Sequence, residues 1–311
     1  MYDVTRGEKM KGLKILSIIS VAVMIFVLVG GALVTKTDSG MGCGANWPLC
    51  YGDWSLEMFI ELSHRIVSSL AGIFILLLSI LSWRKIGHIR EVKFLSFISL
   101  FFLIAQGLFG ASAVIWPQSD TILALHFGVS LISFAAVLLL TILIFEVDHK
   151  FDADSLIIPS YFRKQFIWLA IFTYVVVYSG ALVRHMDSSL ACPDWPFCVN
   201  NDPLVMADWH IGQWVQMGHR FLAAIAFIWT IVLMFQIKKH FRHSKIMYNG
   251  WMIQTGFMVS QVLLGALVIF SLADLTFALL HALIITLYFG VLCYYLLLSY
   301  RSVKKEKHTK S

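Results

Sequence analysis

Long apolar stretches dominate this sequence and limit the folds that it can adopt. Each stretch is close to the ~20 residues that a helix needs to cross a bilayer. Because a backbone inside lipid must satisfy its own hydrogen bonds, helices are the expected structure there. Only 14% of the residues are charged, against about 25% in soluble domains, which argues against a water-soluble globule. We therefore predict an all-α integral membrane protein whose eight transmembrane helices cover residues 15–34, 65–82, 94–115, 121–145, 165–183, 217–237, 247–272 and 275–299.

Basic and acidic residues lie in different connections between these stretches. Lysines and arginines precede the first stretch, follow every second one and end the chain, whereas the other connections carry mostly acids. The positive-inside rule therefore places both termini of this multi-pass protein in the cytoplasm and the acidic loops outside the cell (plasma) membrane. This topology accounts for the net charge of +6, and we predict no nucleic-acid partner.

The second half of the chain repeats the first. Residues 31–50 read GALVTKTDSGMGCGANWPLC, and residues 180–198 read GALVRHMDSSLACPDWPFC. Further matches follow in the same order at a spacing of about 150 residues, the kind of internal repeat that reveals an architecture. An even number of spans in each half makes the halves parallel repeats. We predict two tandem parallel four-helix bundles related by pseudo-twofold symmetry, with domains at 1–150 and 151–311, and such bundles build cofactor sites between facing helices.

One histidine lies near the outer end of each even-numbered span. Ionisable residues inside spans usually face a bundle interior. A lone histidine would more simply bond a neighbouring carbonyl, but two pairs at matching depth favour metal ligation. Two imidazoles without a thiolate or carboxylate cluster suit axial ligation of a heme iron, whereas zinc and copper sites want three or four ligands. The four candidates are His64, His126, His219 and His281.

Small residues on the third and seventh spans either make room for the flat macrocycle or allow ordinary tight helix packing. These residues are Gly107, Gly110, Ala111, Gly265 and Ala266.

The two halves differ beside their histidines. Glu61 lies three residues before His64, on the same helix face, whereas Gln216 stands at the equivalent place in the second half. This asymmetry indicates that the first half performs chemistry and the second holds a cofactor; the alternative is that Glu61 is an interfacial acid. Arg65 and Arg220 each follow a histidine and either contact heme propionates as bidentate donors or reach to the membrane surface.

Two short-spaced cysteine pairs lie in the predicted outer loops. Cys43 pairs with Cys50, and Cys192 with Cys198. Because the outer face of the membrane is oxidising, each pair can close a disulfide. The structural role that we predict is to pin the loop over the site, and a redox role for the first pair is the weaker alternative.

The whole chain resembles the heme A synthase family, in the form that carries cysteine pairs. The resemblance rests on the GALVTKTDSG and WPLC loop, the GluXxxXxxHisArg stretch at 61–65 and a histidine on every even span. It implies an oxidoreductase of cytochrome oxidase assembly that converts heme O to heme A. The C8 methyl group becomes a formyl group through successive hydroxylations, with oxygen from water.

The resemblance also implies roles for individual residues. His64 and His126 would flank the substrate heme O, His219 and His281 would ligate a resident heme b, and Glu61 would be the catalytic acid. It further implies electron transfer through the first cysteine pair, contact with heme O synthase and a tendency to form homo-oligomers. The acceptor of the electrons stays open.

A diheme b-type membrane cytochrome that only transfers electrons explains the four histidines equally well, as does a heme carrier. Neither explains why Glu61 in one half is replaced by Gln216 in the other.

Overall fold

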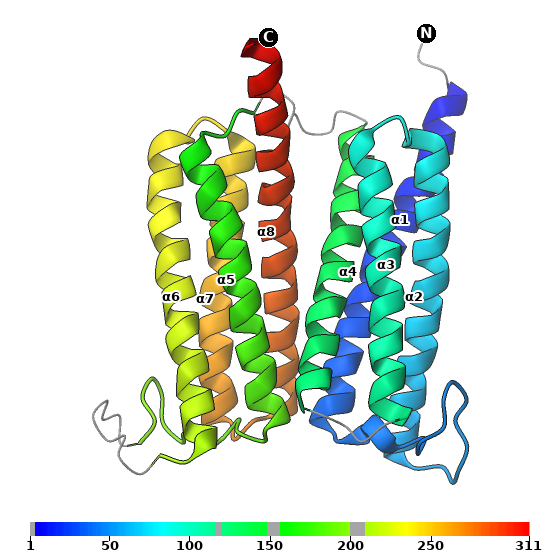
Figure 1. The fold of residues 1–311 in the computed structure, drawn as a ribbon, viewed down its shortest axis with the longest axis vertical. Helices are drawn as coiled ribbons and strands as arrows, with labels where there is room; N and C mark the ends of the chain where they lie inside the picture. Colours follow the sequence, from blue (N-terminus) through cyan, green and yellow to red (C-terminus); the bar gives the residue numbers. More distant parts are fainter. Residues whose placement is uncertain (1–3, 116–119, 148–155, 200–208, 311) are drawn as a thin grey trace. The chain divides into compact units, whose positions relative to one another are not determined.

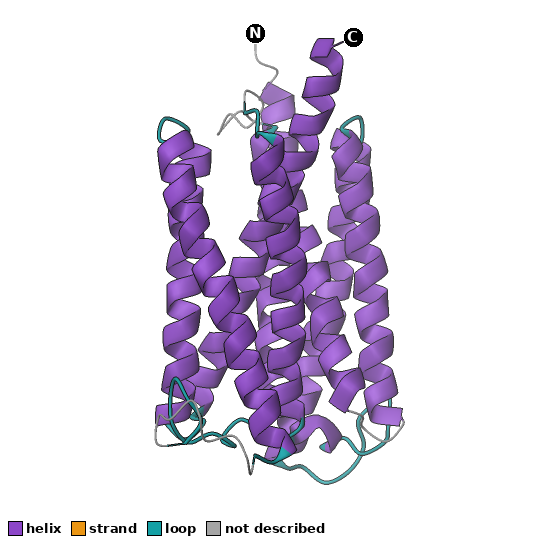
Figure 2. Ribbon diagram, turned by 60° about the vertical axis from the view of Figure 1, so that its left-hand side comes forward, coloured by secondary structure: helices purple, strands orange, loops and turns teal. Residues whose placement is uncertain are grey.

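The structure is a computed structural model that describes residues 4–115, 120–147, 156–199 and 209–310. Every regular element in these residues is a helix, as the purple ribbons of Figure 2 show. Each of the eight α-helices contains a stretch long and apolar enough to cross a membrane. The predicted all-α membrane class is therefore confirmed. The elements are α1 (Val4–Lys36), η1 (Ser39–Met41), α2 (Leu56–Ile86), α3 (Arg90–Ile115), α4 (Asp120–Glu146), α5 (Ser160–His185), α6 (Ile211–His240), α7 (Lys245–Phe270) and α8 (Leu275–Lys310).

The helices extend beyond the apolar stretches, and at the start of α2 this extension contains a candidate site residue. This helix begins at Leu56, whereas the apolar stretch begins at 65. Ser55 caps its N-terminus, because the serine side chain accepts the backbone N–H of Met58 at 3.1 Å and so satisfies one of the free donors of the first turn. Glu57 in that turn suits the positive end of the helix dipole. As a result His64 lies inside α2 rather than at its end.

The chain divides into two compact units (Figure 1). The first comprises Met1–Gln118 and Val129–Asp152, and the second comprises Ser119–Gly128 and Ala153–Ser311. The predicted domains at 1–150 and 151–311, and their pseudo-twofold relation, stay predictions.

In the first unit, α2 packs against both α1 and α3. Hydroxyl groups lie between α4 and its neighbours: Thr141 Oγ1 is 2.9 Å from the Val137 carbonyl of α4 and 3.3 Å from the Ser17 carbonyl of α1, and Ser133 donates to the carbonyl of Ser99 on α3 at 3.4 Å. These bonds satisfy polar groups buried between apolar helices, where an unpaired group is expensive.

In the second unit, α5 and α7 each pack against both α6 and α8. α6 and α8 therefore face each other across the bundle. One end is filled by aromatic rings: Phe166 stacks on Trp251 at a centroid distance of 5.1 Å, and Trp251 meets Tyr295 edge to face at 5.0 Å. Since Phe166 lies early in α5 and Tyr295 late in α8, this core occupies the end away from the loop between α5 and α6.

Each unit carries one disulfide in the loop after its first helix. Cys43 and Cys50 are joined with an S–S distance of 1.99 Å, and Cys192 and Cys198 with 1.98 Å. Within each unit, these loops lie at the end opposite the chain terminus of that unit (Figure 1).

Candidate functional site

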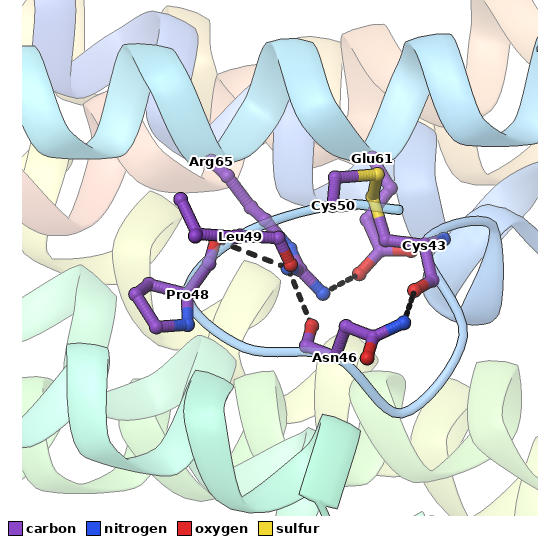
Figure 3. Close-up of polar contacts among 7 residues, drawn as sticks. All are labelled: Cys43, Asn46, Pro48, Leu49, Cys50, Glu61 and Arg65. Atoms are coloured by element: carbon purple, nitrogen blue, oxygen red, sulfur yellow. Dashed lines mark hydrogen bonds and ion pairs between the residues drawn. A yellow bond between two sulfur atoms is a disulfide. The ribbon is translucent and has the colours of Figure 1, made fainter. Parts of the chain in front are cut away.

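Glu61 connects α2 to the disulfide loop of the first unit. Its side chain is buried, with an exposed fraction of 3% for the residue. The Oε2 atom accepts the backbone N–H of Cys43 at 2.8 Å, and the Oε1 atom accepts from Nη2 of Arg65 (Figure 3). Both carboxylate oxygens therefore have donors, and the negative charge lies against a guanidinium group from the next helical turn.

Arg65 extends the same network along the loop. Its Nη1 atom donates to the backbone carbonyls of Asn46 at 2.7 Å, Leu49 at 3.2 Å and Pro48 at 3.3 Å (Figure 3). The Asn46 amide in turn donates to the Cys43 carbonyl at 3.1 Å. A single side chain with several N–H donors in a planar fork can serve so many acceptors, and it fastens the loop to α2.

The second unit builds the same network with a neutral amide. Gln216, also 3% exposed, accepts the backbone N–H of Cys192 at 2.6 Å and donates to the Ser189 carbonyl at 2.8 Å. Arg220 donates to the loop carbonyls of Asp194 at 2.6 Å and Phe197 at 3.0 Å. The second loop is thus held by an acceptor without a negative charge, whereas in the first unit the charge of Glu61 is paired with Arg65.

Both arginines are engaged with their loops. The contacts of Arg65 and Arg220 with heme propionates, as expected from the sequence, stay predictions.

His64 packs against two glycines of α1. A Cβ atom on Gly30 would lie 3.1 Å from His64 Nδ1, and one on Gly31 would lie 3.4 Å from His64 Cε1. The paired glycines therefore make room for the imidazole ring. His126 lies on α4, within the segment Ser119–Gly128 that groups with the second unit. The pairing of His64 with His126 around a substrate stays a prediction.

The other two histidines lie on the helices that face each other in the second unit. His219 on α6 has Nδ1 2.9 Å from the Ser179 hydroxyl of α5. His281 on α8 has Nε2 3.0 Å from the side-chain amide nitrogen of Gln261 on α7. Glycines again adjoin the rings: a Cβ on Gly180 would lie 2.9 Å from Cε1 of His219, and one on Gly265 would lie 3.3 Å from Cε1 of His281.

This donor set fits a heme iron. Two imidazoles come from opposite helices, and the hydrogen bond with Ser179 orients the ring of His219, as outer partners of ligating histidines commonly do. Among the residues that the structure describes, no group of three or more His, Cys, Asp or Glu side chains gathers as a metal cluster. Two nitrogen ligands and a glycine-lined surface match a bis-histidine heme better than a zinc or copper centre.

Three residues of these sites were missed in the sequence: Ser179, Gly180 and Gln261. The repeated GlyAlaLeuVal motif contains Gly180, but the motif alone does not show that a histidine ring packs on its first residue. Gln261 opens the stretch QVLLGALVIF at 261–270, which repeats QGLFGASAVI at 106–115, and Ser179 is a hydroxyl residue inside an apolar helix. Each was therefore visible as an anomaly whose contacts the sequence does not give.

Among the described residues, eight helices able to cross a membrane, histidines on facing helices and disulfide-bonded loops define a multi-pass membrane protein with buried imidazole sites. The family model for cytochrome oxidase assembly proteins matches residues 53–293. The chain belongs to that family.

Relatives with similar sequences cover nearly the whole chain. A heme A synthase from Lysinibacillus sphaericus (strain C3-41) is 52% identical, over 91% of this chain and 94% of the relative. One from Geobacillus kaustophilus (strain HTA426) is 52% identical, over 92% of each chain. A third, from Oceanobacillus iheyensis, is 51% identical, over 96% of this chain and 98% of the relative.

Proposed function

We propose that this chain is a heme A synthase, an oxidoreductase that converts heme O to heme A for cytochrome oxidase. Relatives of that name, 51% to 52% identical and matched over almost their whole length, support the proposal. Within the molecule, the observation that carries it is the exchange of Glu61 for Gln216: both side chains accept the N–H of a loop cysteine, and only Glu61 brings a negative charge. The alternative of a protein that only transfers electrons does not explain why this charge stands in one half alone.

The second half would hold heme b through His219 and His281. A heme bound there supplies a centre that accepts and releases single electrons. Ser179, Gly180 and Gln261 would shape the protein around it. His64 and His126 of the first half would flank the substrate heme O.

The overall conversion needs water, and it releases protons and electrons. A methyl group and one water become a formyl group with the loss of four protons and four electrons, which pass to an acceptor outside the chain. The Glu61 carboxylate lies one helical turn from His64 and is held by Cys43 and Arg65. There it would take a proton from the attacking water as a general base and stabilise positive charge that develops on the oxidised carbon.

The cellular setting is part of the proposal. The charge pattern of the connections supports cytoplasmic termini in the plasma membrane, with both heme sites toward the outer face. A heme O synthase would deliver the substrate, and the chain would form homo-oligomers.

The test is heme extraction and chromatography from membranes that contain the full chain and a source of heme O. We expect the wild-type chain to produce heme A. Glu61→Gln should stop at heme O or a hydroxylated intermediate while keeping heme b. Glu57→Gln is the matched control, because Glu57 is an exposed acid one turn earlier on the same helix.

If the wild-type chain never alters heme O, the protein is a diheme cytochrome or carrier instead. Heme A from Glu61→Gln would remove the acid from the mechanism.

A further inference from the structure

The protons around His219 can be assigned from the hydrogen bonds of Ser179. The Ser179 hydroxyl donates to the carbonyl of Val176 at 2.7 Å, and a hydroxyl has one proton to give. With that proton on the shorter bond, the serine oxygen is the acceptor at its contact with His219 Nδ1, at 2.9 Å. The neutral imidazole thus carries its proton on Nδ1, and Nε2 keeps the lone pair that can bind a metal.

The first unit presents the same surface to its histidine without the hydroxyl. The repeat that matches Gly31 with Gly180 also matches Gly30 with Ser179. The backbone of Gly30 lies against the corresponding ring nitrogen, since a Cβ there would be 3.1 Å from His64 Nδ1. Glycine has no side chain, so position 30 cannot supply the hydrogen bond that position 179 supplies.

We propose that Ser179 is a positioning residue that makes His219 a permanent heme ligand, and that Gly30 leaves His64 an exchangeable one. The inference rests on the proposed function, which gives the two halves opposite needs. A resident cofactor must stay bound through many turnovers, whereas a substrate heme must leave as product. A hydrogen bond from Nδ1–H holds the ring orientation and makes Nε2 a stronger donor to iron.

A hydroxyl in an apolar helix also has a simpler role, which is to bond the carbonyl one turn back. That role concerns α5 alone and requires nothing of the histidine. The two roles differ in what they predict for the heme, because a bond within α5 leaves the imidazole and its iron unaffected.

The first experiment measures heme b in the purified full-length protein with Ser179→Ala. We expect retention of heme b to fall about 10- to 100-fold, the usual cost of removing such an outer partner. The midpoint potential of the heme that remains should rise, because a weaker imidazole donor stabilises the ferric state less, and its low-spin electron paramagnetic resonance signal should shift. Ser179→Thr keeps the hydroxyl, so its heme b retention, midpoint potential and resonance signal should match those of the wild type. Ser160→Ala, the same change at an exposed position of α5, should leave all three measurements unchanged.

Unaltered retention, potential and spectrum in Ser179→Ala would overturn the role of Ser179. If Ser179→Ala does not accumulate as folded protein, the test uses the midpoint potential and the spectrum of Ser179→Thr instead. Values equal to those of the wild type support the inference, whereas values that differ although the hydroxyl is present overturn it. None of these readouts requires turnover. If heme b binding depends on Ser179 as expected but the protein never forms heme A, the proposed function is refuted and the role of Ser179 is not.

The second experiment places the hydroxyl in the first unit with Gly30→Ser. The new side chain would adjoin His64 Nδ1, so product heme A should leave more slowly and copurify in larger amount relative to heme b. Gly72→Ser on α2 is the control, because a Cβ there meets nothing within 4 Å. An unchanged ratio of heme A to heme b in Gly30→Ser would overturn the role assigned to Gly30.

Discussion

The Glu61 carboxylate accepts the backbone N–H of Cys43 at 2.8 Å, so the acid of the first unit is bonded directly to a residue of its disulfide. Gln216 makes the same bond to Cys192 in the second unit. The bond is therefore common to both loops, whereas the negative charge and its ion pair with Arg65 belong to the first. This comparison separates the bond by which Glu61 holds the loop from the charge, for which we propose a part in the chemistry.

Glu61→Ala should be less stable than Glu61→Gln. The amide can still accept the Cys43 N–H, as Gln216 does for Cys192, whereas alanine leaves that buried donor without an acceptor. An unsatisfied buried donor costs about 1–3 kcal/mol. Thermal unfolding in detergent should therefore show a lower Tm for Glu61→Ala than for Glu61→Gln, although neither variant should form heme A. Equal Tm values would mean that the bond contributes nothing to the loop.

Arg65→Lys should loosen the loop although it keeps the positive charge. An ammonium group is a compact charge, whereas the guanidinium fork of Arg65 serves Glu61 and three loop carbonyls together. Hydrogen exchange of the backbone amides at 43–50 should be faster in Arg65→Lys than in the wild type. Arg84→Lys on the same helix is the control, because Arg84 lies in its last turn. Protection equal to the wild type would show that the carbonyl contacts do not hold the loop.

The helices could be predicted from the sequence, and some of their ends could not. Apolar stretches report the lipid-crossing part of a helix, because burial in lipid selects for them. The first two turns of α2 contain Glu57 and Glu61, so they lie outside the apolar stretch even though they are helical. Ser55 followed by Glu57 was the local signal for the true start.

The candidate site was visible in the sequence as residue types, but its contacts were not. The repeat singled out Glu61 against Gln216 because one position changed while its surroundings did not. The donors to that carboxylate could not be predicted in this way, since one is the backbone N–H of Cys43 and depends on the path of an irregular loop. A sequence specifies side chains, and it does not show where the backbone N–H and C=O groups of an irregular loop point. For the same reason Arg65 was assigned to the propionates or to the membrane surface, without its bonds to loop carbonyls.

Each disulfide should contribute a similar amount of stability. The two bonds close loops of sequence separation 7 and 6, and loops of this size are worth about 2–3 kcal/mol by chain entropy. Replacing Cys43 and Cys50 together by serine should therefore lower the Tm about as much as replacing Cys192 and Cys198 together. Cys293→Ser tests for a general effect of cysteine loss, because Cys293 forms no disulfide. If only one double substitution lowers the Tm, the loop of the other pair is held by its arginine without help from its disulfide.

Gly180→Ala should reduce heme b binding more than Gly265→Ala. A Cβ on Gly180 would come within 2.9 Å of His219 Cε1, a distance that forces the ring to move, whereas the closest approach at Gly265 is 3.3 Å from His281 Cε1 and asks for a few tenths of an ångström. Each ring has a hydrogen-bond partner, Ser179 for His219 and Gln261 for His281, so the larger displacement forced by Gly180→Ala should disturb its ring more. The heme absorbance per protein should therefore rank wild type first, Gly265→Ala second and Gly180→Ala last. Gly256→Ala is the matched control on α7, since a Cβ there meets nothing within 4 Å and alanine favours the helix. The opposite order would mean that the ring of His281, and not that of His219, is the more tightly positioned of the two.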